Sequence, residues 1–124
     1  MQNCNLKLKT DIKLRTYKFS LAIIRFINDL PKSQTNKIIS SQLLRSATSI
    51  GANIIEAQAG SSKKDFKNFM NVALLKSANE TKYWLCLLRD SGLVEKKKVS
   101  RLLQEAVELS NILGASMLRL KGRK

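Results

Sequence analysis

Few side chains of this protein could do acid–base chemistry, because the chain has no histidine, the commonest general base and metal ligand. Glu56 and Glu80 could act as a general acid and base if two helices brought them together. The alternative is a buried polar layer in which Arg45 pairs with one of these carboxylates and Asn53 bridges, which fixes helix register at some cost in stability. We favour the structural layer and predict no enzyme activity, no metal and no cofactor.

Clusters of basic residues are the second candidate, because 23 Lys and Arg stand against 9 Asp and Glu, a net charge of +14. Such a charge attracts phosphate polymers and anionic membranes, and it also keeps a protein soluble. The candidate nucleic-acid contacts precede or open expected helices: Lys7, Lys9, Lys13, Arg15, Lys63, Lys64, Lys67, Lys96, Lys97 and Lys98. The aromatic residues occupy mostly core-like positions and no base-reading motif is present, so binding should be directed at backbone phosphates and sensitive to salt.

Four long helices would position these residues. The chain has a single proline, Pro31, which ends the first helix because the residue before a proline leaves the α region. Gly60-Ser61-Ser62 and Ser91-Gly92 mark the other breaks, with Gly60 as a left-handed residue closing the second helix. We predict one all-α domain, 1–124, with helices at about 10–30, 34–59, 63–90 and 95–120. Short connections require consecutive helices to run antiparallel, which gives an up-down four-helix bundle.

The apolar spacing predicts a core and a further contact surface. Residues of the fourth helix recur at alternating steps of four and three: Val99, Leu103, Ala106, Ser110, Leu113, Met117 and Leu120. The first helix carries two apolar stripes, one of Ile12, Phe19, Ile23, Phe26 and Leu30 and one of Leu14, Tyr17, Leu21 and Ile24. A helix that is apolar on two faces exceeds what one small bundle buries, so we predict self-association.

Two local patterns indicate how the helices begin and pack. Glycine inside a helix costs about 1 kcal/mol relative to alanine, so Gly51, with Ala47 and Ala52 beside it, indicates close approach of another helix. Ser62 followed by Asp65 resembles a capping box at the start of the third helix.

Cysteine usage and hydropathy indicate the compartment. Cys4 and Cys86 lack the spacing of a metal or disulfide motif, so we expect free thiols, with Cys86 filling the core. No run approaches the roughly 18 apolar residues of a membrane span, and the start of the chain lacks a signal-peptide core. We therefore predict a protein of the bacterial cytoplasm.

The middle of the chain resembles a known family. Residues 42–50 (QLLRSATSI) and 53–57 (NIIEA) resemble its pattern QLxRAxxSIxxNIxEG, and 62–69 (SKKDFKNF) and 77–80 (SANE) resemble its SxxDFxxFL and SxxE elements. The family comprises small bacterial four-helix bundle proteins encoded within intervening sequences of large-subunit ribosomal RNA genes, often labelled as ribosomal proteins. The resemblance covers roughly 43–93. Ala57 replaces the usual glycine, so the second helix is expected to run a turn further.

This resemblance implies a homopentamer, a ring of five bundles around a central channel. It also implies kinship with the accessory protein of diversity-generating retroelements, a basic pentamer that binds a reverse transcriptase and nucleic acid. Two functions stay open: a non-enzymatic scaffold that binds RNA or DNA through phosphates, or an adaptor for a protein such as a reverse transcriptase, with the charge serving solubility. Membrane binding is not expected, because a stable oligomer leaves no apolar helix face free.

Overall fold

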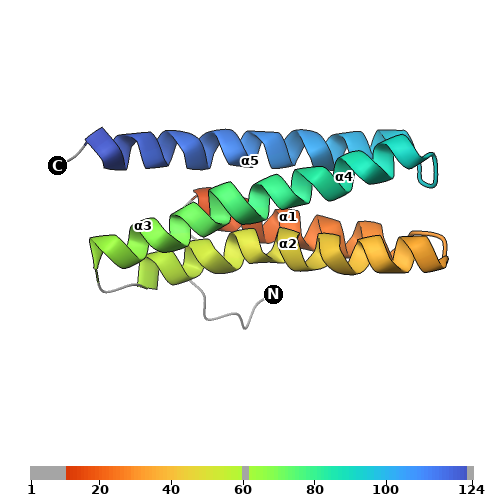
Figure 1. Cartoon of the computed structure of the whole chain (residues 1–124), viewed down its shortest axis with the longest axis horizontal. Helices are drawn as coiled ribbons and strands as arrows, with labels where there is room; N and C mark the ends of the chain where they lie inside the picture. Colours follow the sequence, from red (N-terminus) through yellow and green to blue (C-terminus); the bar gives the residue numbers. More distant parts are fainter. Residues whose placement is uncertain (1–10, 60–61, 123–124) are drawn as a thin grey trace.

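All regular structure in the described part of the chain is helical, as predicted. The computed structural model describes residues 11–59 and 62–122. Its elements are α1 (Asp11–Asn28), α2 (Gln34–Ala59), α3 (Lys63–Asn71), the π-helical segment η1 (Val72–Ala78), α4 (Asn79–Ser91) and α5 (Lys96–Gly122). Because α3, η1 and α4 follow one another without a break, they form one rod, and the structure has four rods in all (Figure 1).

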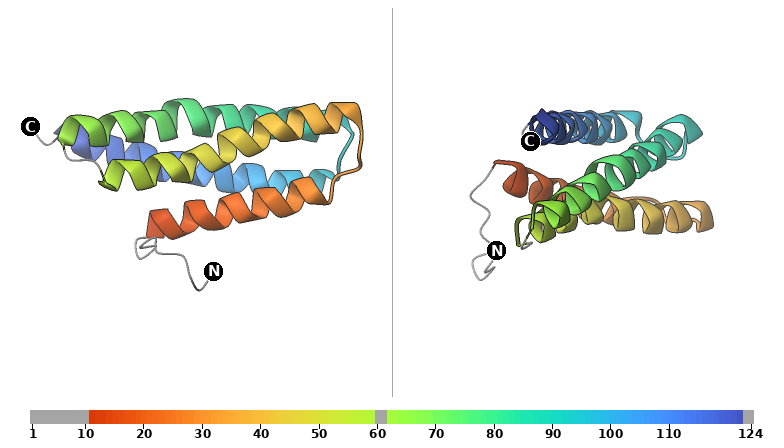
Figure 2. Two further views of the ribbon diagram at one scale, coloured as in Figure 1. Left: turned by 90° about the horizontal axis from the view of Figure 1, so that it is seen from below. Right: turned by 60° about the vertical axis from the view of Figure 1, so that its left-hand side comes forward.

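The connections between rods lie at the two ends of an elongated molecule. The loops 29–33 and 92–95 lie at the same end, and the end of α2 and the start of α3 lie at the other (Figure 1). Two further views show α1, α2, the α3–η1–α4 rod and α5 arranged around a common centre (Figure 2). The predicted helix at 63–90 is corrected in one respect, since its middle is a wide π turn that the apolar pattern did not indicate.

Local hydrogen bonds explain where the helices begin and end. The Asp65 amide donates to Ser62 Oγ (3.1 Å), which confirms the predicted cap of α3. In the same way, the backbone N–H of Asn36 donates to Ser33 Oγ (3.1 Å) at the start of α2, a cap that was not predicted from the sequence. Gly92 ends α4 with φ of 76°, a conformation that favours glycine. The predicted closing role of Gly60 lies outside the described residues.

The core forms along the predicted seams. In α5 the buried residues are Val99, Ala106, Leu109, Ser110, Leu113 and Met117, while Leu103 is half-buried and the Leu120 side chain lies outside the description. They pack with Phe19, Ile23 and Phe26 of α1, Leu43, Ile50 and Ile54 of α2, and Leu85 and Leu88 of α4. Fully burying a side chain of this kind contributes about 1.5–3 kcal/mol, so this cluster is the main source of stability.

Gly51 has the packing role that its position indicated. A Cβ atom placed on Gly51 would lie 3.3 Å from Thr16 Oγ1 and 3.4 Å from Thr16 Cβ. Thr16 is buried, and its hydroxyl donates to the carbonyls of Ile12 (2.9 Å) and Lys13 (3.0 Å). The missing side chain therefore allows α1 and α2 to approach closely at this point.

Candidate nucleic-acid interface and self-association surfaces

One basic cluster is built at the end of the molecule that holds the two loops. Lys96, Lys97 and Lys98 form the first turn of α5 and are all exposed. Among the described residues, Lys98 forms one ion pair, with Glu95 at 4.0 Å, and no ion pair is formed by Lys96 or Lys97. The positive N-terminal end of the α5 dipole adds to their attraction for anions.

The fold adds two lysines to this cluster that sequence spacing did not group with it. Lys32 lies in the loop 29–33 and Lys37 lies at the start of α2, and both are exposed. The two loops face each other across a hollow of about 290 Å³ lined by residues of both, including Pro31, Val94 and Lys98. We call Lys32, Lys37, Lys96, Lys97 and Lys98 the loop-end cluster.

The opposite end holds a smaller exposed cluster. Lys63, Lys64 and Lys67 are exposed in the first turns of α3, as the sequence analysis expected. Lys13 is half-buried on α1, which begins farther from this end than α3 does (Figure 1). The candidates Lys7 and Lys9 lie outside the described residues. Within the described residues, the exposed lysines of this cluster are therefore the three on α3.

Arg15, unlike the lysine candidates, is paired with two carboxylates. Its guanidinium donates to both carboxylate oxygens of Glu105 (3.0 and 2.8 Å) and to Glu108 (2.9 Å). The hydrogen bonds to Glu105, and then those to Glu108, raise the pKa of Arg15 above its ordinary value. A bidentate arginine–carboxylate pair of this kind is among the stronger ion pairs, so Arg15 links α1 to α5.

The predicted polar layer is correct in one pair and wrong as a buried layer. Arg45 bonds to Glu80, which also accepts a hydrogen bond from Trp84 Nε1 (3.1 Å). The Arg45 side chain, however, is 55% exposed, and Glu56 is exposed as well. Asn53 bonds back to Ser49 on its own helix instead of joining this pair. Arg45 and Glu56 lie on the exposed side of α2, because its buried side is filled mainly by small and aliphatic residues.

A different polar layer lies inside the bundle and consists of hydroxyl groups. Thr81 Oγ1 lies 3.0 Å from Ser46 Oγ and also donates to the Ser77 carbonyl (2.7 Å), while Ser77 Oγ lies 2.9 Å from Ser49 Oγ. These bonds join α2 to η1 and α4, where buried polar groups need partners. None of these hydroxyls titrates near neutral pH, and the described residues contain no group of three or more acidic or cysteine side chains able to hold a metal.

Within residues 11–59 and 62–122, two apolar faces are exposed on the single chain. The first, the α1–α2 face, contains the second predicted stripe of α1 and a neighbour on α2: Leu14, Tyr17, Leu21, Ile24 and Leu44. Leu14 is 37% exposed and Ile24 is 40% exposed. The predicted two-sided character of the first helix is therefore confirmed, with one stripe in the core and one at the surface.

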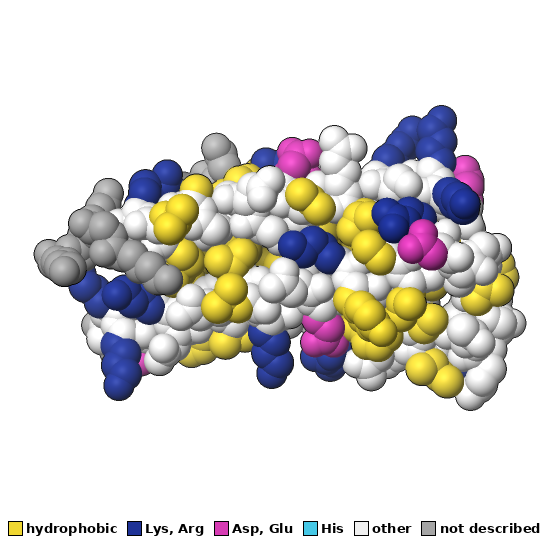
Figure 3. All heavy atoms as spheres, turned by 45° about the horizontal axis from the view of Figure 1, so that its top comes forward, with side chains coloured by type: hydrophobic (Ala, Val, Ile, Leu, Met, Phe, Trp, Pro, Cys, Tyr) yellow, Lys and Arg dark blue, Asp and Glu magenta, His cyan; other side chains and the backbone are white. Residues whose placement is uncertain are grey.

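The second face, the α4 face, contains Leu75, Tyr83, Trp84 and Leu87. Tyr83 is 58% exposed and contacts Trp84 edge to face, which corrects its placement among core-like aromatics. Figure 3 shows one face of the molecule, on which hydrophobic side chains are exposed along the length, with Lys and Arg side chains among them and at both ends. Cys86, on the same helix, carries a free thiol as predicted, but it is half-buried and not one of the core residues, which corrects its expected place in the core. Cys4 lies outside the described residues.

Comparison with known proteins agrees with this architecture. Residues 9–115 match the family model of the 23S rRNA-intervening sequence protein. The chain is 36% identical to a crystal structure from Bacteroides thetaiotaomicron, described as a protein of unknown function from the S23 ribosomal protein family. That structure aligns with a TM-score of 0.79 over 86% of this chain and 97% of the other.

Two negative findings accompany the match. No curated protein matches the chain. Within the described residues, none of the helices is sufficiently long and apolar to span a membrane. Because the family model covers most of the sequence, this chain belongs to the 23S rRNA-intervening sequence protein family.

Proposed function

We propose that this protein is a non-enzymatic, cytoplasmic scaffold whose copies assemble into a ring and bind RNA or DNA through backbone phosphates. The observation that carries the binding proposal is the loop-end cluster, where five exposed lysines from α2, α5 and a loop lie at one end of the molecule. Lysine ammonium groups bind phosphates without reading base sequence. The family name, which refers to an intervening sequence of ribosomal RNA, supports a nucleic acid as the partner.

The ring rests on the two apolar faces. The α1–α2 face and the α4 face lie on different helices of one subunit. A contact between the α1–α2 face of one subunit and the α4 face of the next is therefore head to tail. Head-to-tail contacts generate closed rings when the rotation between subunits closes. Five subunits is the number that the family resemblance implies, and five copies at +14 each carry +70. The loop-end clusters would then repeat around one end of the ring.

A mixing experiment tests the ring. Ile24→Lys places a charge in the α1–α2 face and Tyr83→Lys places one in the α4 face, so light scattering should find each variant smaller than the wild-type assembly. Each variant keeps the face that the other has lost, so an equimolar mixture should form heterodimers and nothing larger. Leu118→Lys is the control, because Leu118 is exposed on α5 outside both faces. A wild-type monomer at micromolar concentration, or assembly that survives both substitutions, contradicts the ring.

Salt-dependent binding tests the nucleic-acid contact. The logarithm of the binding constant for unrelated single-stranded RNAs should fall linearly with the logarithm of salt concentration, with a slope of about −0.7 per phosphate contacted. Replacing Lys96, Lys97 and Lys98 by glutamate should reduce the slope by about 2 per subunit engaged. The same change at Lys63, Lys64 and Lys67 alters the net charge equally at the other end and should have less effect. Affinity that is independent of salt contradicts the proposal.

The second candidate function is a protein-interaction adaptor, in which the charge serves solubility. It is favoured by the exposed Tyr83 and Leu75, because large exposed apolar side chains gathered on one face mark protein interaction sites. Purification after nuclease treatment separates the two functions. A stoichiometric protein that stays bound after the nucleic acid is removed favours the adaptor, whereas retained RNA protected from the nuclease favours the scaffold.

A further inference from the structure

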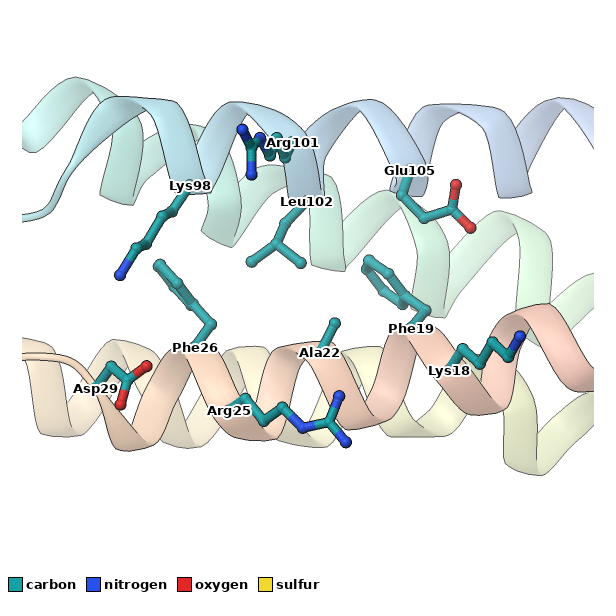
Figure 4. Close-up of a pocket in the computed structure, with 10 residues that line it drawn as sticks. All are labelled: Lys18, Phe19, Ala22, Arg25, Phe26, Asp29, Lys98, Arg101, Leu102 and Glu105. Carbon is teal, nitrogen blue, oxygen red and sulfur yellow. The ribbon is translucent and has the colours of Figure 1, made fainter.

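A groove between α1 and α5 shares only Lys98 with the loop-end cluster and no residue with the two apolar faces. It has a volume of about 480 Å³. Its floor is apolar and is formed by Phe19, Ala22 and Phe26 of α1 and Leu102 of α5, which point into the space between the two helices (Figure 4). Phe19 and Phe26 are 2% and 7% exposed, so the hollow lies over the small Ala22 between their rings.

The edges of this groove carry an excess of positive charge. Lys18 and Arg25 lie along the α1 edge, and Lys98 and Arg101 lie along the α5 edge (Figure 4). Two carboxylates also line the groove. One of them, Glu105, is already bonded to Arg15, and the other, Asp29, forms no ion pair among the described residues. A ligand in the groove would therefore meet basic side chains on both sides of an apolar floor.

The form of the groove decides which ligand fits. It is an open trough between two helices, whereas small-molecule sites enclose most of their ligand. The apolar floor and buried rings offer no stacking surface for the bases of a nucleic acid. A second copy does not supply the complementary charge, because no helix in the described ranges has more acidic than basic residues. Phe19, Ala22 and Phe26 span two turns, or about 10 Å, which suits a short helical contact.

We infer that this groove docks an amphipathic, acidic helix of another protein. Apolar side chains of the partner helix, spaced at i, i+3 and i+7, enter the hollow over Ala22, and its Asp and Glu residues face the basic edges. Helix-in-groove recognition uses this spacing of apolar anchors. Lys18 and Arg25 lie four residues after Leu14 and Leu21 on α1, so the α1 edge of the groove borders the α1–α2 face.

Binding of a designed peptide to the full-length protein tests this inference. The probe is a fluorescein-labelled 18-residue helix with Leu at i, i+3 and i+7 and Glu on both flanks, followed by fluorescence anisotropy. We expect binding to the wild type in the micromolar range, and at least about tenfold weaker binding by two control peptides, one with Lys in place of Glu and one with Ser in place of Leu. No binding of the acidic peptide, or equal binding of either control peptide, overturns the inference.

Variants of the protein locate the site. Ala22→Trp fills the hollow and should weaken binding at least about tenfold, and Arg25→Glu with Arg101→Glu should do the same through the edges. Lys67→Glu with Arg119→Glu changes the net charge equally at exposed positions outside the groove and should weaken binding less than about threefold. Circular dichroism checks folding, and the edge variants leave the packed floor intact. Equal weakening by the distant pair, or unchanged binding by Ala22→Trp, shows that charge alone attracts the peptide and overturns the inference.

Discussion

Replacing Gly51 by alanine sets two opposing effects of known size against each other. Alanine in a helix interior is favoured over glycine by about 1 kcal/mol. The added methyl group would lie 3.3 Å from Thr16 Oγ1, closer than such contacts normally are, and 3.4 Å from Thr16 Cβ, at the short end of ordinary contact. Thr16 cannot easily move away, because it is buried, its branched side chain is stiff, and its hydroxyl is bonded to two carbonyls.

The close contact should outweigh the gain in helix propensity. Overpacking of a tight core costs about 1–3 kcal/mol, so Gly51→Ala should lower the free energy of unfolding by about 1 kcal/mol. In the Thr16→Ala background the obstacle is absent, and the same substitution should raise it by about 1 kcal/mol. The coupling between the two positions is then about 2 kcal/mol in a double-mutant cycle.

Urea unfolding of the four proteins measures this coupling, and thermal unfolding should show shifts of about 4 °C per kcal/mol. Gly114→Ala is the matched control, because a Cβ atom there meets nothing within 4 Å, and it should simply stabilise α5 by about 1 kcal/mol. If Gly51→Ala stabilises the wild type as much as Gly114→Ala does, with no coupling to Thr16, α1 and α2 are not packed as described.

Three further predictions concern polar contacts. Arg15→Ala should lower the free energy of unfolding by about 1 kcal/mol and couple with Glu105→Ala in a double-mutant cycle. Because the pKa of Arg15 is raised, the stabilisation by this pair should not decline as pH rises through neutrality. The hydrogen bonds from Arg89 lower the pKa of the Asp90 carboxyl, so this pair is lost only as pH falls through the lowered value. An NMR titration of Asp90 should show the low midpoint, and Arg89→Ala should raise it. Thr81→Val removes hydroxyl bonds from the interior and should cost about 1–2 kcal/mol in urea unfolding, with faster amide exchange in η1.

The sequence predicted the rods well because their ends have local causes. Pro31, the cap at Ser62 and the left-handed Gly92 act over a few residues, so four helical segments could be placed within about two residues of the observed bounds. The π segment was missed, because a widened turn still places apolar residues on the inner side. The hydroxyl of Ser77 in this segment bonds to Ser49 of α2, and no local pattern in residues 72–78 could indicate a partner on another helix.

The candidate site was predicted less well, because its parts depend on contacts between rods. The pairing of Arg45 with a carboxylate was foreseen, but its exposure depends on which side of α2 faces solvent. Arg15 was grouped with neighbouring lysines by sequence, whereas its real partner, Glu105, lies 90 positions away along the chain. Lys32 and Lys37 joined the loop-end cluster only because two loops meet at one end.

The π turn in η1 also bears on how this chain tolerates changes in length. A π turn closes its hydrogen bonds one residue later than an α turn, so segment 72–78 stores a spare residue within an otherwise regular rod. Deleting a residue there would let the rod continue as ordinary α-helix with the sides of α3 and α4 that face the core unchanged. The same deletion in α2 or α5 would rotate everything beyond it by about 100° and turn the core side chains outward.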